Sequence, residues 1–170
     1  MTPHQHHSIS ISLPPANCFT ILVIDDMLPN RVLLRKILAN AGYEVVEAAN
    51  GEEALELLIN GEVRPHLIIT DIEMPIMDGI TMAKHLKLPE HGLESIPVLA
   101  ASGNADDNMR RDALSAGCDV FMTKPFDLRT LRREIAALLK AKRNRPDRRS
   151  SSASALAPNR LDTSADKIRS

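Results

Sequence analysis

Acidic residues follow two apolar segments of the sequence directly. Asp25 and Asp26 come after FTILVI, and Asp71 comes after HLIIT. Short apolar runs are typical of strands in a parallel sheet, whose carboxyl ends converge on one crevice. Three carboxylates in one crevice repel one another, so the arrangement is costly unless a cation binds there. A set of carboxylate oxygens with open positions suits Mg²⁺, with Mn²⁺ as a substitute.

Two further polar residues follow apolar segments in the same way. Ser102 comes after PVLAA, and Lys124 comes after VFMT. If these segments are neighbouring strands, both side chains point into the crevice that holds the carboxylates. A hydroxyl and an ammonium group are donors that neutralise phosphoryl oxygens on the side away from a metal. The sequence therefore predicts an acceptor carboxylate with a phosphate clamp.

The elements that must position these residues alternate between apolar and amphipathic segments, which is typical of repeated βα units. The predicted strands span residues 19–24, 44–48, 66–70, 97–101 and 120–122. The first, third and fourth are almost purely apolar, as expected of strands covered on both faces. We expect the third strand to be central.

Start and stop signals predict a helix after each strand. The first helix starts at Pro29 and ends before Gly42, with a core face of Val32, Leu33, Ile37 and Leu38. Asn50, Asp78 and Asp106 precede the next three helices. Asp127 can cap the fifth, whose core stripe is predicted as Leu128, Leu131, Ile135, Leu138 and Leu139.

Four motifs occur in order along residues 18–142: VIDDMLPNR, TDIEMPIMDG, VLAASGNA and GCDVFMTKPF. Together they resemble response-regulator receiver domains of the CheY-like type, found as single-domain regulators or attached to hybrid histidine kinases. The resemblance implies an α/β fold, a doubly wound (βα)5 flavodoxin-like sandwich. Its parallel five-stranded sheet has the order 2-1-3-4-5.

The resemblance also implies roles for the acidic residues. Asp71 resembles the phosphoacceptor nucleophile. Asp26 and Asp71 resemble direct Mg²⁺ ligands, Asp25 a ligand through water, and Glu73 a ligand through its backbone carbonyl.

Other residues resemble those that hold the phosphoryl group in this family and those that change conformation when it binds. Ser102 and Lys124 resemble the pair that holds the phosphoryl oxygens, and the Lys124–Pro125 peptide falls where the family commonly has a cis bond. Ser102 and Phe121 resemble the switch residues. Glu73 and Asn104 stand where the family tunes the lifetime of the phosphorylated state.

By the same resemblance, the chain takes a phosphoryl group from a phosphohistidine of a sensor histidine kinase or histidine phosphotransfer protein. It then switches the surface formed by the fourth helix, fifth strand and fifth helix to control a partner protein. The implied chemistry is self-catalysed phosphotransfer and autodephosphorylation, not that of a true enzyme. We expect a monomer with a phosphorylation-linked dimer.

An alternative is a phosphohydrolase that uses an Asp nucleophile with Mg²⁺. Enzymes resembling haloacid dehalogenases place Asp-x-Asp after their first strand, whereas this chain has adjacent Asp25 and Asp26.

Composition suggests one domain with two extensions. Residues 1–141 carry 13 basic and 19 acidic side chains, whereas residues 142–170 carry 8 and 3. We therefore predict a disordered leader over residues 1–17, the receiver domain over 18–142 and a disordered basic, Ser-rich tail over 143–170. The tail could bind an acidic partner, a nucleic acid or an anionic nucleotide second messenger, but we expect neither direct control of transcription through DNA nor membrane binding. Cys18 and Cys118 are expected as buried thiols of a cytoplasmic protein.

Overall fold

The computed structural model describes residues 19–104 and 106–143 of the chain. Its sheet consists of β1 (Thr20–Ile24), β2 (Glu44–Ala48), β3 (Leu67–Asp71), β4 (Val98–Ser102) and β5 (Val120–Thr123). The strands are parallel and lie in the order β2-β1-β3-β4-β5, so the predicted fold and the central position of the third strand are confirmed. The predicted leader and nearly all of the predicted tail lie outside the described residues.

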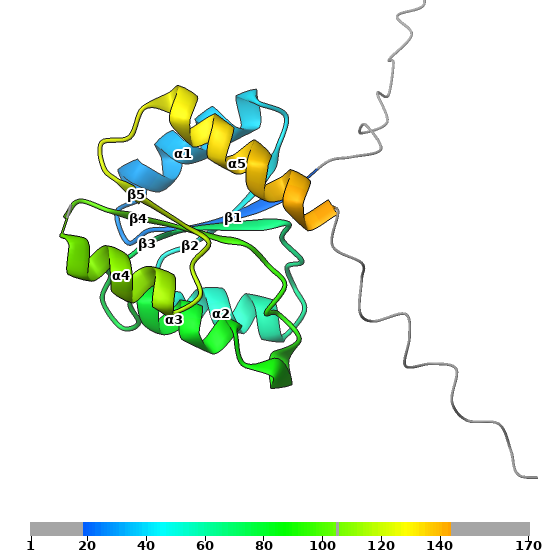
Figure 1. Ribbon diagram of the computed structural model, residues 1–170. Coiled ribbons are helices and arrows are strands. Elements are labelled where there is room, and N and C mark those ends of the chain that lie inside the picture. The colour runs from blue at the N-terminus through cyan, green and yellow to red at the C-terminus, as the bar shows by residue number, and fades with distance from the viewer. Residues whose placement is uncertain (1–18, 105, 144–170) are drawn as a thin grey trace, which may run out of the picture.

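Helices cover both faces of the sheet (Figure 1). One layer holds α1 (Leu28–Asn40) and α5 (Leu128–Arg143). The other layer holds α2 (Gly51–Ile59), α3 (Gly79–Leu86) and α4 (Asp107–Ser115), with a short 3-10 helix, η1 (Pro89–His91), following α3. This arrangement buries every residue of β4 and all but one end residue of β1 and β3.

The buried side chains form two apolar clusters, one on each face of the sheet. Alternate residues of a strand point to opposite faces. Ile21 and Val23 of β1 therefore join the cluster under α1 and α5, whereas Leu22 and Ile24 join the cluster under α2, α3 and α4.

The predicted helix starts are confirmed where side chains cap the backbone. The oxygens of four residues accept hydrogen bonds from N–H groups in the first turns of α2, α3, α4 and α5: Asn50, Asp78, Asp106 and Asp127. Each bond satisfies a donor that has no partner within the helix.

Two residues predicted to face the core are exposed instead. Leu33 is 59% exposed and Leu128 is 45% exposed. In α1 the buried residues are Leu34 and Leu38. Apolar side chains at five nearby positions cover more than one face of this helix, so the periodicity could not identify which face is buried. Leu128 is the first residue of α5, so it lies at the end of the stripe where no element covers it.

One cysteine lies among the described residues, in the core. Cys118 is a free, buried thiol, and burial raises its pKa to about 11. Cys18 lies outside the described residues.

Among the helices that the structure describes, none combines the length and the hydropathy needed to cross a bilayer.

Candidate functional site

Three carboxylates meet at the carboxyl ends of β1 and β3. These strands are neighbours, with Ile24 paired to Thr70, so the residues that follow this pair lie side by side. Asp25, Asp26 and Asp71 each offer a carboxylate oxygen, and these atoms all lie within 4.8 Å of one another. Asp25 is buried, whereas Asp26 and Asp71 are half-buried.

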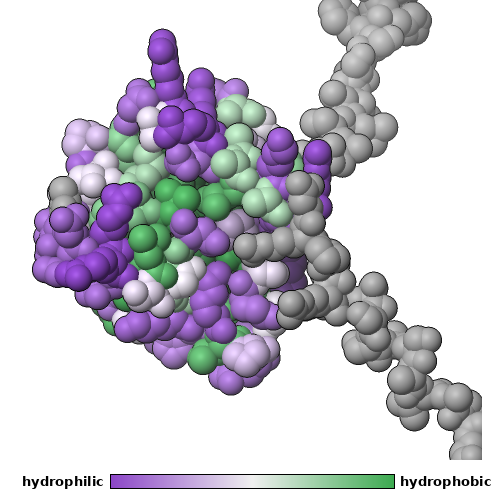
Figure 2. Space-filling view, in the orientation of Figure 1, coloured by the Kyte–Doolittle hydropathy of each residue, from purple (hydrophilic) through white to green (hydrophobic). Residues whose placement is uncertain are grey.

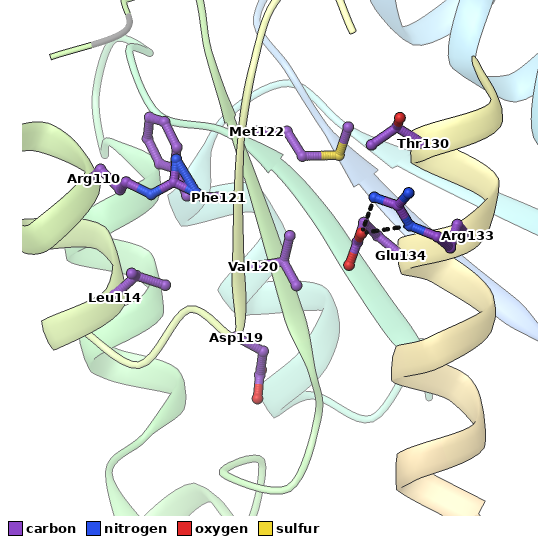
Figure 3. Close-up of a pocket in the computed structure, with 9 residues that line it drawn as sticks. All are labelled: Arg110, Leu114, Asp119, Val120, Phe121, Met122, Thr130, Arg133 and Glu134. Atoms are coloured by element: carbon purple, nitrogen blue, oxygen red, sulfur yellow. Dashed lines mark hydrogen bonds and ion pairs between the residues drawn. The ribbon is translucent and has the colours of Figure 1, made fainter. Parts of the chain in front are cut away.

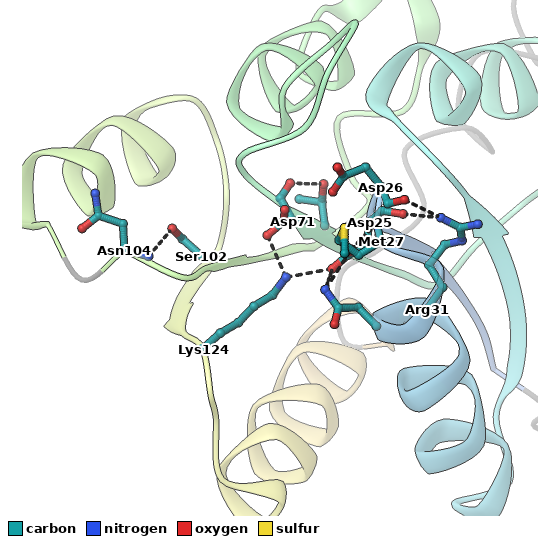
Figure 4. Close-up of polar contacts among 10 residues, drawn as sticks. Asp25, Asp26, Met27, Arg31, Asp71, Ser102, Asn104 and Lys124 are labelled. Atoms are coloured by element: carbon teal, nitrogen blue, oxygen red, sulfur yellow. Dashed lines mark hydrogen bonds and ion pairs between the residues drawn. The ribbon is translucent and has the colours of Figure 1, made fainter.

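Lys124 follows β5 and reaches across β4 to this cluster (Figure 4). Its Nζ donates hydrogen bonds of 2.8 Å to Asp25 Oδ2 and 2.8 Å to Asp71 Oδ1. The Lys124–Pro125 peptide bond is cis, as the resemblance implied. One ammonium group therefore bridges carboxylates from two different strands.

The pKa values of the bridged groups reflect burial and pairing. Burial raises the pKa of Asp71, the Lys124 hydrogen bond opposes this effect, and the negative charges of Asp25 and Asp26 add to the rise. Burial alone would lower the pKa of Lys124, but its hydrogen bonds to Asp25 and Asp71 outweigh burial, and the pKa is raised. Lys124 is thus held as a cation beside a carboxylate whose negative charge is destabilised.

Asp25 is held by donors on several sides. Its Oδ1 accepts a hydrogen bond of 2.9 Å from Met27 N, and both of its oxygens accept bonds of 3.1 Å from Asn30 Nδ2. With the Lys124 bond, these contacts nearly fill the lone pairs of the carboxylate. Asn30 was not singled out from the sequence, because a polar residue in the first turn of a helix is usually a solvated one.

Arg31 fixes the backbone of the two adjacent aspartates. Its guanidinium donates to the carbonyl oxygens of Asp25 at 2.6 Å and Asp26 at 3.3 Å. The same group forms an ion pair of 3.4 Å with Glu47 at the end of β2. α1 and β2 therefore both contribute to the position of the carboxylates.

Gly79 allows α3 to approach the site closely. A Cβ atom at this position would lie 2.2 Å from the carbonyl oxygen of Asp71, which is far inside van der Waals contact. The Gly79 N–H donates to the Ile72 carbonyl at 2.9 Å. The Asp78-Gly79 pair thus starts the helix directly against the strand end that carries Asp71.

The carboxylate cluster fits a hard divalent cation. All three side chains present oxygen, and the Asp26 carboxylate accepts no hydrogen bond from the residues that the structure describes. Oxygen ligands on one side with open positions on the other are what Mg²⁺ uses when it also binds phosphate oxygens. The donor set therefore fits the predicted magnesium site.

Ser102 is the last residue of β4 and is fully buried. Its hydroxyl donates a hydrogen bond of 3.1 Å to Met109 Sδ and accepts one of 2.9 Å from Asn104 N. In Figure 4 the hydroxyl points toward Asn104 and away from Asp71. The prediction that Ser102 points into the carboxylate crevice is therefore not met by this conformation, in which α4 and its preceding loop hold the hydroxyl.

The remaining predicted residues lie around the cluster. Phe121 is buried, 5% exposed, in the apolar cluster under α4, and the Arg110 guanidinium lies 5.4 Å from its ring centre. Glu73 and Asn104 are exposed. Asn104 Oδ1 accepts a hydrogen bond of 3.1 Å from Asp106 N at the start of α4.

A groove of about 390 Å³ lies beside Phe121, between α4, β5 and α5. Figure 3 shows the residues that line it: Arg110, Leu114, Asp119, Val120, Phe121, Met122, Thr130, Arg133 and Glu134. Figure 2 shows apolar surface in the middle of this face, between the two helix layers and surrounded by hydrophilic side chains. The groove thus combines an apolar floor with a charged rim.

Comparison with known sequences identifies relatives of several lengths. The chain is 32% identical to sporulation initiation phosphotransferase F of Bacillus subtilis over 124 residues, covering 73% of this chain and 96% of that protein. It is 35% identical over 108 residues to the sensor histidine kinase CheAY of Helicobacter pylori, covering 64% of this chain and 13% of that protein. It spans only about half or less of several other relatives, including 52% of the phosphate regulon transcriptional regulatory protein PhoB of Pseudomonas aeruginosa.

Solved structures agree with this relationship. The signal receiver domain of a signal transduction histidine kinase from Syntrophus aciditrophicus superposes with a TM-score of 0.68 at 32% identity, covering 76% of this chain and 96% of that one. The chemotaxis response regulator CheY4 of Vibrio cholerae gives 0.64 at 27% identity, covering 72% and 99%. A sequence model of the response regulator receiver domain matches residues 21–136. The chain therefore belongs to the response regulator receiver domain family.

Proposed function

We propose that the chain is a phosphoacceptor of a two-component or phosphorelay system and that Asp71 receives the phosphoryl group. The observation that carries this proposal is the bridge from Lys124 Nζ to Asp25 and Asp71, at 2.8 Å each, inside a cluster of three carboxylates. A carboxylate with a purely structural role would need one partner, whereas here one cation bridges two carboxylates of a three-carboxylate cluster.

The proposed reaction exchanges one bond for another. A carboxylate oxygen of Asp71 attacks the phosphorus of a phosphohistidine, an acyl phosphate bond forms, and the phosphorus–nitrogen bond breaks. The imidazole leaves and regains a proton from water. Lys124, already in contact with Asp71, stays beside the transferred group and neutralises one of its oxygens. Attack by water on the phosphorus later releases inorganic phosphate and restores Asp71.

Asp26 and Asp71 would hold Mg²⁺ directly, with the Glu73 carbonyl as a third ligand from the chain. Asp25 would act through a water molecule, which agrees with its carboxylate already being bound by Met27, Asn30 and Lys124. The ion, when bound, supplies positive charge to the phosphoryl oxygens during transfer.

The phosphoryl donor is proposed to be a sensor histidine kinase or a histidine phosphotransfer protein. Relatives of this chain include a protein named as a sensor histidine kinase and one named as a phosphotransferase. The groove between α4, β5 and α5 is proposed to contact the downstream protein after Ser102 and Phe121 switch. Glu73 and Asn104, both exposed near the site, are proposed to set how long the phosphoryl group persists.

The test is intact-mass measurement after incubation with acetyl phosphate and Mg²⁺. We expect the wild-type chain to gain one phosphoryl mass and to lose this gain when Mg²⁺ is removed with a chelator. Asp71→Asn should show no gain, and Asp119→Asn, which changes an aspartate in the distant groove, should behave as the wild type.

Two results would contradict the proposal. Label that persists in Asp71→Asn would place the acceptor elsewhere. Multiple-turnover hydrolysis of an ordinary phosphomonoester would indicate a phosphohydrolase, because a receiver turns over only its own acyl phosphate.

A further inference from the structure

The two adjacent aspartates of the carboxylate cluster are bound very differently. The Asp25 carboxylate accepts hydrogen bonds from Met27 N at 2.9 Å and from Lys124 Nζ at 2.8 Å. Both of its oxygens also accept bonds of 3.1 Å from Asn30 Nδ2. The Asp26 carboxylate accepts none from the residues that the structure describes. Asn30 therefore supplies much of the difference between a saturated carboxylate and an open one.

Asn30 is the third residue of α1, and its side chain is half-buried. The amide nitrogen must lie toward Asp25, because the opposite orientation would turn the amide oxygen toward a negatively charged group. The amide itself is neutral. It occupies lone pairs of the Asp25 carboxylate but leaves the negative charge of the cluster available to a cation, whereas a lysine or arginine at this position would neutralise that charge.

Asn30 gains importance when Lys124 turns to a phosphoryl group. Lys124 Nζ divides its bonds between Asp25 Oδ2 and Asp71 Oδ1, as Figure 4 shows. A phosphoryl oxygen on Asp71 competes for this ammonium group, because it is a charged acceptor. Once Lys124 Nζ moves, Asn30 Nδ2 is the one donor to Asp25 Oδ2 that remains among the described residues.

We infer that Asn30 is a positioning residue that keeps the Asp25 carboxylate from binding the metal ion directly. This role rests on the proposed function and adds a determinant of its metal coordination. An Asp25 carboxylate that was free to bind would take a position in the metal shell that a water molecule or a phosphoryl oxygen needs. Asn30 thus acts through Asp25 and reserves this position for the reaction.

The test uses Mn²⁺ as the probe ion and the full chain. Calorimetry measures the Kd for Mn²⁺, and water proton relaxation measures the number of water molecules on the bound ion. Asn30→Leu keeps a similar size but donates no hydrogen bond, so Asp25 becomes free to bind. The variant should bind Mn²⁺ about threefold more tightly and with about one water molecule fewer. Its initial rate of phosphate gain from acetyl phosphate should fall about tenfold, because less of the metal shell stays open.

Asn40→Leu is the matched control, since Asn40 is exposed at the last residue of the same helix. Asp25→Asn gives a second comparison, because it removes the carboxylate that Asn30→Leu would free. In the Asp25→Asn background, Asn30→Leu should change neither the Kd for Mn²⁺ nor the number of bound water molecules. Melting temperatures show whether each variant folds, and Asn30→Ala repeats the measurement if Asn30→Leu does not.

The outcomes separate the role of Asn30 from the proposed function. If the wild type binds Mn²⁺ and gains phosphate, but the Asn30 variants bind the ion with the same Kd and the same number of water molecules as Asn40→Leu, the positioning role is wrong and the receiver function stands. A lower melting temperature without any change in Mn²⁺ binding would likewise show that Asn30 only stabilises α1. If the wild type neither binds Mn²⁺ nor gains phosphate, the proposed function is wrong and the role of Asn30 with it.

Discussion

The two ends of the sheet differ in how they are built. At the carboxyl ends, three carboxylates lie within 4.8 Å of one another and are bridged by Lys124. At the amino ends, Phe19 packs edge-on against His66, with ring centres 5.2 Å apart, and Thr20 N donates to His66 Nδ1 at 3.0 Å. Ion pairs bridge the strands at the carboxyl end, whereas ring packing and a hydrogen bond to a ring nitrogen join β1 to His66 at the amino end.

The difference shows how one sheet can both hold a cluster of carboxylates and stabilise the folded domain. Burial raises the pKa of Asp71, which means that its ionised form opposes folding above that pKa. The amino end compensates with apolar contacts and with backbone hydrogen bonds between β1 and the start of β3, including His66 N to Thr20 O at 2.8 Å. The carboxyl ends of the strands can therefore keep like charges close together, because contacts at the amino ends stabilise the fold.

The largest expected effect comes from removing the bridging cation. Lys124→Met should lower the free energy of unfolding by about 2 kcal/mol, less than for a fully buried pair because the side chain is partly solvated. Chemical denaturation at neutral pH measures this, and Mg²⁺ should restore part of the loss by replacing the missing positive charge. Lys87→Met, which removes a lysine that bonds to the carbonyl oxygens of Glu94 and Ile96, is the control for a lysine distant from the carboxylates. Equal recovery of both variants with Mg²⁺ would contradict the electrostatic account.

The amino end should affect stability without affecting chemistry. Phe19→Ala removes a half-buried ring from His66 and from the groove that it shares with Tyr43 and Leu139, at a cost of about 1.5 kcal/mol. The rate of phosphate gain from acetyl phosphate, measured well below the unfolding temperature, should be unchanged. A reduced rate in the folded variant would show that the two ends are coupled.

The smallest effect is a pH dependence at His66. Burial lowers its pKa from 6.5, and the positive charge of Lys142 lowers it further. Since the unfolded chain binds this proton more readily, the stability from His66 is complete above pH 6.5 and declines as pH falls toward the folded pKa.

His66→Asn keeps an acceptor near the Thr20 N–H and cannot be protonated. Its melting temperature should therefore fall less than that of the wild type between about pH 7.5 and 5.5, as calorimetry can measure. An identical slope for both proteins would rule out His66 as a source of the dependence.

Much of the fold and part of the site could be predicted from local patterns. The alternation of short apolar and amphipathic segments identified all five strands, and Asn50, Asp78, Asp106 and Asp127 marked helix starts that the structure shows as caps. These features depend on residues near one another in sequence, where propensity and hydrogen bonding are readable. The orientation of Leu33 was predicted wrongly because several apolar residues of α1 compete for one face.

The sequence by itself determined that Asp25, Asp26, Asp71 and Lys124 stand at strand ends, and parallel strands bring such residues to one edge of a sheet. Only the tertiary structure decided how they are paired: that Lys124 bridges Asp25 and Asp71, that Asn30 holds Asp25, and that Met109 binds the Ser102 hydroxyl. The physical reason is distance along the chain. Lys124 and Asp25 are 99 residues apart, and a side-chain hydrogen bond depends on ångström-scale packing that no local pattern encodes.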